Sequence, residues 1–530
     1  MTDATASGGS RDADGDDPPN VLLVVLDSVR AANTSLHGYR RQTTPFLERY
    51  ADRAGVAAYD HAVSPGNTSV TSHASMFTGR HVPEHGLSES VTDRRLAPGH
   101  TVWEDLPHET GVFSNNPFLT ELDVGLRDAF ETVVARRQEL PFPDGVNVKH
   151  FLIDAGEGLG RFPAFARAAA TSDRPIGSLV NGLAFRLADT RAERLLPERW
   201  RLDGSADVYV DALLDWVDER AGPWAACVNL MDAHFPYQPG EHDAWGDPDD
   251  RYHQATVHDE ATIPWSYLSG ERPLAELERL VDRYDGAVRH LDAAVEGLVG
   301  ALADRDALAE TLVVVTADHG EGFGEAAPLR EGCRFVGHGN GGVGEPLVHV
   351  PLVVDPPGDG DGAVAPDGPI ASLTNVPDAV AAALDGDPAA AAAAFARDPV
   401  LTTTPGTDLP GDAGVDGDDV GEGADPVVDR DDLAPYGESA GAVYRAAEGA
   451  VDAASADRND APVARKHERW GPVAGALDVW RDGRVTAAGE ADPDALALLD
   501  DLEPADLLEA TSGEPVDEVT ADRLEALGYR

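Results

Sequence analysis

The sequence predicts an α/β protein with a mostly parallel central sheet, helices on both faces of that sheet, and a smaller C-terminal α+β subdomain. Three continuous aliphatic runs, at 20–26, 224–230 and 311–316, have the composition of strands buried on both faces of a parallel sheet. Amphipathic stretches lie between these runs, and such strand–helix alternation is typical of α/β domains. At 404–432 the chain becomes rich in Gly, Asp and Pro, and this composition predicts a linker before a second unit.

The individual elements follow from local patterns along the chain. Pro45, directly after two threonines, predicts the first turn of a helix over 44–54. Apolar residues at helical spacing predict a long helix over 274–303, and a Ser/Thr cluster opens a short helix at 72–78. The remaining predicted strands are 111–114, 351–354, 442–445, 476–480 and 485–487, and the remaining predicted helices are 207–220, 376–384 and 519–527.

Composition divides the chain into four segments. Residues 1–17 are polar and acidic and are expected to form a disordered tail. Residues 18–403 carry the α/β pattern, and residues 404–440 form an acidic, low-complexity linker or loop. Residues 441–530 form the C-terminal α+β subdomain.

The charge balance excludes one class of partner. The 530 residues include 41 Lys and Arg against 95 Asp and Glu, a net charge of −54, so the phosphate backbone of a nucleic acid would be repelled. Only Lys149 and Lys466 are lysines, and this acidic, lysine-poor composition is typical of a salt-adapted, halophilic cytoplasm. The acidity therefore indicates a habitat rather than a ligand.

Targeting signals and cysteine usage point to the cytoplasm. The N-terminal stretch lacks the apolar core of a secretory signal, and no run of about 18 apolar residues predicts a transmembrane segment. Cys227 and Cys333 are the only cysteines, which is too few for a disulfide framework. We therefore expect a cytoplasmic protein, with an oligomeric state that the sequence leaves open.

Acidic and histidine side chains follow three of the aliphatic runs. Asp27 ends the first, Asp232 and His234 follow the second, and Asp318 and His319 follow the third. A single Asp after a strand is most often a turn or capping residue. Because ligands bind beyond the carboxyl ends of parallel strands, three such ends together predict a divalent cation site.

Residues 64–79 are rich in hydroxyl side chains, and these side chains crowd the start of the predicted helix at 72–78. Free N–H groups at a helix start favour an anion, so a hydroxyl there can act as a nucleophile beside a cation. Plain N-capping by Ser69, Thr71 or Ser72 would produce the same local pattern.

Taken together, these motifs resemble the sulfatase family of the alkaline phosphatase superfamily. The resemblance rests on PNVLLVVLDSVRA, SVTSHASMFTG, MDAHFPY, TADHGEGFGE and GHGN in this order, over about residues 18–385. It implies an alkaline-phosphatase-like fold, with 18–403 as the catalytic domain, and one divalent metal ion (Ca, Mg, Mn or Zn) held by Asp27, Asp318 and His319. It also implies a nucleophile ten positions before Gly79, which is Ser69.

The resemblance assigns roles to three histidines as well. His234 matches a residue that contacts the ester or protonates its leaving group. His338 lies at a position where the family often has a Lys or His that contacts the transferred group. We expect His73 to hold the oxygens of that group together with His338. Asn115 and Asn116 occupy a place where relatives sometimes have a substrate-facing polar residue.

Two departures from the family pattern shape the expected chemistry. Sulfatases that convert their nucleophile to formylglycine use Cys/Ser-x-Pro-x-Arg, whereas this chain has Thr71 and His73 at the Pro and Arg positions. Formylglycine at Ser69 is therefore not expected. The second Asp of many sulfatases is Ser28 here, which cannot supply a carboxylate.

The leading interpretation is a metal-dependent hydrolase or transferase of sulfate, phosphate or phosphonate esters with a seryl nucleophile. Its substrate would be a small-molecule or glycan ester. Two alternatives stay open: a two-metal phosphodiesterase whose second site is Asp232, His234 and His338, and a catalytically inactive relative that binds an anionic glycan or headgroup. The sequence leaves open the ester, the metal and the choice between hydrolysis and transfer.

Overall fold

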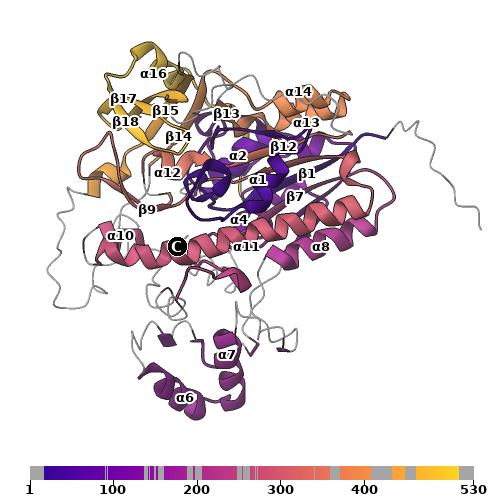
Figure 1. Ribbon diagram of the computed structural model, residues 1–530, viewed down its shortest axis with the longest axis vertical. Helices are drawn as coiled ribbons and strands as arrows, with labels where there is room; N and C mark the ends of the chain where they lie inside the picture. Colours follow the sequence, from indigo (N-terminus) through magenta and orange to yellow (C-terminus); the bar gives the residue numbers. More distant parts are fainter. Residues whose placement is uncertain are drawn as a thin grey trace, which may run out of the picture.

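A seven-stranded sheet forms the centre of the protein (Figure 1). The computed structural model describes residues 17–135, 160–187, 206–247, 263–358, 370–406, 433–447 and 461–512, except 90, 92, 269, 271 and 340, with 141–142, 144–148, 151–152, 195–196 and 254 in addition. The sheet order is β2-β12-β8-β1-β7-β5-β6. The parallel strands are β8 (Thr311–Thr316), β1 (Asn20–Leu26), β7 (Trp224–Leu230), β5 (Glu109–Ser114) and β6 (Thr132–Val134), and β12 (Leu352–Asp355) and β2 (Ala57–Ala58) extend the edge in antiparallel pairing.

The register of the three central strands places their carboxyl ends at one edge. Val25 of β1 pairs with Asn229 of β7 on one side and with Thr316 of β8 on the other. All three strands are buried along their whole length, as continuous aliphatic runs require in a sheet covered on both faces. The predicted bounds of these strands and the mostly parallel sheet are confirmed.

Helices cover both faces of the sheet (Figure 1). On one face lie α8 (Ala206–Asp218) and α11 (Leu277–Asp304), and on the other lie α2 (Ser69–Thr78), α13 (Val376–Leu384) and α14 (Pro388–Ala393). The predicted long helix is α11, which buries Leu280, Tyr284 and Val288 at helical spacing. The other α-helices are α1 (Pro45–Ala51), α3 (Val82–His85), α4 (Pro117–Thr120), α6 (Arg161–Thr171), α7 (Pro175–Leu187), α10 (Ile263–Leu268), α12 (Glu345–Val348) and α16 (Pro493–Asp500).

A five-stranded antiparallel sheet forms the C-terminal subdomain. Its order is β14 (Val400–Thr404), β15 (Ala440–Ala446), β16 (Ala464–Trp470), β17 (Val473–Val479) and β18 (Val485–Gly489), and α16 packs on β15. Two strands of this sheet were not predicted. β14 ends at the start of the predicted linker, and β16 has the charged sequence ARKHERW, which contains no apolar run. Most of the predicted linker (407–432), the tail at 1–16 and the predicted helix at 519–527 lie outside the described residues.

Short sheets join the two large ones. The three-stranded sheet β11-β3-β13, formed by His349–Val350, His61–Val63 and Ile370–Ser372, contacts β14 and β15 of the C-terminal sheet. β19 (Leu508–Ala510) returns to pair with β4 (Arg94–Leu96), and β9 (Gly322–Ala326) pairs with β10 (Arg334–Gly337). The C-terminal chain is therefore packed against the central body at several places.

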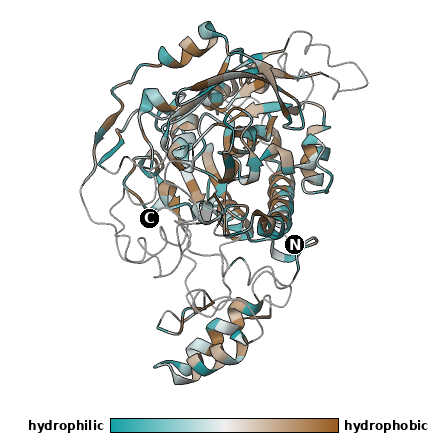
Figure 2. Ribbon diagram, turned by 90° about the vertical axis from the view of Figure 1, so that its left-hand side faces the viewer, coloured by the Kyte–Doolittle hydropathy of each residue, from teal (hydrophilic) through white to brown (hydrophobic). Residues whose placement is uncertain are grey.

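The helix pair α6–α7 stands apart from this body in both views (Figures 1 and 2). It has a small apolar cluster of its own, Val148, Leu152, Phe165 and Phe185. Within the described part of the chain, no helix is both long and apolar enough to cross a membrane.

Candidate active site

The three predicted metal ligands meet at the carboxyl edge of the central sheet. Asp27 directly follows β1, and Asp318 and His319 lie just past the end of β8. All three side chains are 0% exposed, and one potential ligand atom from each lies within 4.8 Å of the others. The parallel register of β1 and β8 produces this convergence, because it brings the two strand ends to one place.

The Asp318 carboxylate is half satisfied by the chain. Its Oδ1 accepts hydrogen bonds from the backbone N–H groups of Ser28 (3.2 Å) and His319 (3.0 Å). Its Oδ2 has no hydrogen-bond partner among the described residues, although it lies 3.5 Å from His319 Nε2. A buried carboxylate oxygen without a donor is costly, so this oxygen fits a bound cation.

The ring orientation of His319 suits a metal ligand. Its Nδ1 lies 2.9 Å from the carbonyl oxygen of Gly320, which can only accept, so Nδ1 carries the proton and Nε2 offers its lone pair in the neutral ring. Burial lowers the pKa of His319, but the carboxylates of Asp318 and Asp27 more than offset it and raise the pKa above its ordinary value. The lone pair that takes this proton is the one a cation would use.

Amide and hydroxyl donors hold the Asp27 carboxylate. The Nδ2 groups of Asn116 and Asn229 each donate to its Oδ2 over 3.1 Å, and the Ser28 hydroxyl donates to Oδ1 over 2.9 Å. Burial alone would raise the pKa of Asp27, but nearby histidines, His234 first, and the Asn229 hydrogen bond lower it to about 2. Asp27 is therefore ionised and fixed in orientation.

Ser28 supports both carboxylates from a strained backbone. Its φ of 63° is in the left-handed region, which costs a non-glycine residue about 1 kcal/mol or more. This conformation lets its N–H reach Asp318 and its hydroxyl reach Asp27, while the Tyr284 hydroxyl donates to its carbonyl over 2.7 Å. The residue that stands in place of a second Asp thus positions ligands instead of supplying one.

Ser69 is the first residue of α2 and faces the three ligands. Its Oγ lies 3.4 Å from Asp27 Oδ2 and 3.4 Å from His319 Nε2. The residue at the N-cap is Thr68, and it makes no capping hydrogen bond with its side chain. Capping therefore does not account for the position of Ser69.

His73 lies one helical turn after Ser69. Its Nδ1 donates to the Ser69 carbonyl over 2.8 Å and lies 3.6 Å from Asp318 Oδ2. Its Nε2 is buried and has no hydrogen-bond partner among the described residues. That nitrogen can therefore donate to a ligand oxygen once it is protonated.

Two further histidines pack beside His319. The His338 ring lies 4.3 Å from the His319 ring and 5.0 Å from the His234 ring, measured between centroids. Burial lowers the pKa of His234, and burial together with His319 lowers the pKa of His338 to about 3. Glu321 Oε2 lies 3.2 Å from His338 Nδ1, and burial raises the pKa of this carboxyl to about 7.

Three polar residues near the ligands were not predicted in these positions. Asn229 is the only polar residue in the strand WAACVNL, and Glu321 follows Asp318-His319-Gly320 directly, so each had a local signal. Asn116, expected to face a substrate, instead caps α4 through Oδ1 and donates to Asp27 through Nδ2.

The residues of the alternative second metal site have other contacts in the structure. Asp232 accepts from the Ala206 backbone N–H over 3.2 Å and lies 3.4 Å from His290 Nε2. Among the described residues, the ligand atoms of Asp232, His234 and His338 do not all lie within 4.8 Å of one another.

Comparisons with known proteins identify the family of this chain. The profile of the Sulfatase family matches residues 19–113 and 154–385, which is more than half of the chain. A search of curated proteins finds no match.

Three solved structures share the fold. The phosphonate monoester hydrolase of Agrobacterium radiobacter has a TM-score of 0.52 at 15% identity and covers 91% of this chain and 93% of its own. The phosphonate monoester hydrolase SpPMH from Silicibacter pomeroyi has a TM-score of 0.51 at 16% identity, with coverages of 91% and 93%. BT4656, solved in complex with its substrate D-glucosamine-2-N,6-O-disulfate, has a TM-score of 0.50 at 10% identity, with coverages of 88% and 93%. The family match and the shared fold together make this chain a member of the sulfatase family, within the alkaline phosphatase superfamily.

Proposed function

We propose that this protein is a metal-dependent hydrolase or transferase of sulfate, phosphate or phosphonate esters, with an unmodified Ser69 as its nucleophile. The observation that carries the proposal is the position of the Ser69 hydroxyl, 3.4 Å from both Asp27 Oδ2 and His319 Nε2. A hydroxyl held between two potential metal ligands is placed to lose its proton and attack.

Asp27, Asp318 and His319 would hold one divalent cation. Two carboxylates and one imidazole suit Ca²⁺, Mg²⁺, Mn²⁺ or Zn²⁺, and the unsatisfied Asp318 Oδ2 fits such an ion. When bound, the cation lowers the pKa of the neighbouring hydroxyl and offsets charge on the transferred group.

The chain's own residues carry the transfer in two steps. Ser69 Oγ forms a bond to phosphorus or sulfur while the bond to the ester oxygen breaks. His234, neutral because burial lowers its pKa, takes up a proton as Ser69 is deprotonated and gives it to that oxygen. His338 donates to one of the remaining oxygens when its Nε2 carries the ring proton. His73 donates to another only as the doubly protonated ring, because its Nδ1 proton is already donated to the Ser69 carbonyl. These oxygens also face the free N–H groups at the start of α2. Water, or an acceptor hydroxyl in a transferase, then attacks the seryl ester, Ser69 leaves, and His234 recovers a proton.

An unmodified serine favours phosphorus esters. A formylglycine hydrate has a second hydroxyl that expels sulfate, whereas a sulfated serine must be cleaved by attack at sulfur. A phosphoserine can instead be hydrolysed in line by water. The residues Thr71 and His73, in place of Pro and Arg, support an unconverted Ser69.

Peptide mass spectrometry combined with a substrate panel tests the proposal. We expect Ser69 at its unmodified mass, and turnover of a phosphodiester or phosphonate monoester at least equal to that of an aryl sulfate. Ser69→Ala should keep the metal but lose turnover and any covalent adduct. Ser72→Ala is the matched control, because Ser72 lies on the same helix and contacts Ser64 over 2.9 Å.

Two results would overturn parts of this proposal. A loss of about two mass units at Ser69, the two hydrogens removed in forming an aldehyde, would show formylglycine. Metal retention by the wild-type protein without turnover of any ester would favour the inactive, ligand-binding alternative. Adding an acceptor alcohol to the assay separates transfer from hydrolysis, because a transferase would form a new ester between the transferred group and that alcohol.

A further inference from the structure

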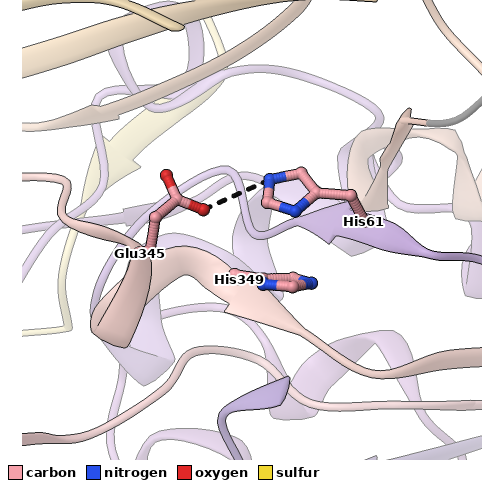
Figure 3. Close-up of side chains that lie close together, drawn as sticks. All are labelled: His61, Glu345 and His349. Atoms are coloured by element: carbon pink, nitrogen blue, oxygen red, sulfur yellow. Dashed lines mark ion pairs between the residues drawn. The ribbon is translucent and has the colours of Figure 1, made fainter. Parts of the chain in front are cut away.

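A second buried cluster of potential metal ligands lies between the two large sheets. His61 is on β3, Glu345 is the first residue of α12, and His349 is on β11, and Figure 3 shows their side chains drawn together. The three residues are 0%, 4% and 1% exposed, respectively. One potential ligand atom from each lies within 4.8 Å of the others.

The ring nitrogens in this cluster lack partners. Neither nitrogen of His61 and neither nitrogen of His349 has a hydrogen-bond partner among the described residues, and neither does Glu345 Oε2. His61 Nε2 lies 3.2 Å from Glu345 Oε2, within the distance of an ion pair. By contrast, both nitrogens of buried His85 are bonded, to the Ser75 hydroxyl and to the Leu87 N–H, each over 3.0 Å.

The other oxygen of Glu345 is already held. The Tyr444 hydroxyl donates to Oε1 over 2.6 Å, and Lys466 Nζ lies 3.3 Å from the same atom. These contacts orient the carboxylate and leave Oε2 facing His61. Outer hydrogen bonds of this kind fix ligands in metal sites.

The charges around the cluster leave a negative excess. Lys466 is the cation shared by two buried carboxylates, those of Glu345 and of Glu468, which lies 2.8 Å from Nζ. Two buried carboxylates that share one lysine favour a further cation beside Glu345.

We propose that His61, Glu345 and His349 bind a structural zinc ion that connects the central body to the C-terminal sheet. Two imidazole nitrogens and a carboxylate oxygen are ligands that Zn²⁺ uses, and around a tetrahedral ion they lie about 3.4 Å apart. The 3.2 Å separation of His61 Nε2 and Glu345 Oε2 already matches this spacing. Water completes the fourth position.

The role follows from what Glu345 contacts. Its carboxylate is bonded to Tyr444 of β15 and lies beside Lys466 of β16, while His61 and His349 sit on the paired strands β3 and β11. The ion therefore ties that short sheet to the C-terminal sheet through Glu345. The ligands are too deeply buried for a substrate to reach the ion, so its role is stability.

Zinc binding by a full-length Asp27→Asn/Asp318→Asn variant tests the proposal apart from the active site. After dialysis against Zn²⁺ and removal of excess metal, we expect one zinc per chain by mass spectrometry of the metal. Adding His61→Gln or His349→Gln should remove that zinc. His37→Gln is the matched control, since buried His37 bonds Thr34 and the Tyr59 carbonyl instead, and it should keep the zinc.

Two outcomes would overturn the proposal: no zinc in the Asp27→Asn/Asp318→Asn protein, or zinc retained after His61→Gln. If the histidine variants do not fold, X-ray absorption at the zinc edge of the Asp27→Asn/Asp318→Asn protein decides, because the proposal requires two imidazole ligands. Loss of activity in this double variant says nothing against the structural ion, so the two metal assignments fail independently.

Discussion

The two buried clusters of the molecule contain similar ligand types in different surroundings. Asp27, Asp318 and His319 follow parallel strands, and the hydroxyl of Ser69 points at them from a helix start. His61 and His349 instead sit on short strands beneath the C-terminal sheet. The hydroxyl that contacts this second cluster, that of Tyr444, is already bonded to Glu345.

This difference fits the two proposed roles, a reactive site and a structural one. A catalytic metal site needs a position that a substrate can reach and a nucleophile beside it, whereas a structural site is closed to substrate. In the first cluster, N–H and O–H donors hold both oxygens of Asp27 and Oδ1 of Asp318. Among the described residues, Asp318 Oδ2 and His73 Nε2 have no hydrogen-bond partner. In the second, Tyr444 and Lys466 close the cluster from the C-terminal side.

The largest expected effect comes from removing an active-site ligand. Asp318→Ala should abolish metal binding at the first cluster and lower kcat/KM by at least about 10³-fold, because a ligand on a strand end has no nearby substitute. The second cluster should keep its zinc. Full metal occupancy at both clusters, measured together with ester turnover, would show that the first assignment is wrong.

Breaking the charge balance of the second cluster should cost stability and not activity. Lys466→Met leaves two buried carboxylates without their cation, which should lower the free energy of unfolding by about 3–5 kcal/mol. Urea denaturation measures this loss, and kcat per folded chain should stay unchanged. The control Arg469→Met, on the same strand, removes an exposed pair with Asp500 and should cost at most about 1 kcal/mol. Equal losses in the two variants would contradict the distinction.

A smaller effect is expected from a residue that positions Asp27. Asn229→Leu removes a donor to Asp27 Oδ2, and we expect a loss of about 10–100-fold in kcat/KM with the fold retained. Asn20→Leu is its control, since Asn20 is a polar residue at the opposite end of β1, where it accepts from the Trp224 N–H. Asn20→Leu should lower stability and leave kcat/KM unchanged. If Asn20→Leu lowers kcat/KM as much as Asn229→Leu does, the Asn229 effect is one of stability alone.

The smallest expected effect sharpens the comparison at the second cluster. Tyr444→Phe removes one hydrogen bond to Glu345 and should lower the free energy of unfolding by about 1 kcal/mol. If the bond orients a metal ligand, zinc affinity falls by about tenfold as well. Calorimetry of zinc binding to the Asp27→Asn/Asp318→Asn protein, with and without Tyr444→Phe, measures the second effect. An unchanged affinity would limit the hydroxyl to a packing role.

Local patterns in the sequence determined the central strands and their chemistry. The runs at 20–26, 224–230 and 311–316 coincide with β1, β7 and β8, because burial on both faces requires continuous aliphatic residues. The parallel sheet then brings strand ends together by a general rule, so Asp27, Asp318 and His319 could be placed near one another before the fold was known. The position of Ser69 beside them rested on the family motif.

Only the tertiary structure decided the contacts that carry no local pattern. β3 and β11 are three and two residues long, too short to show a period, and their pairing brings His61 and His349 together across almost 300 residues of chain. β16 has five polar or charged residues in a row between Ala464 and Trp470, and Lys466 enters the interior there because Glu345 and Glu468 meet it. Such partners are set by how the two sheets pack on each other, and a sequence read segment by segment does not contain that packing.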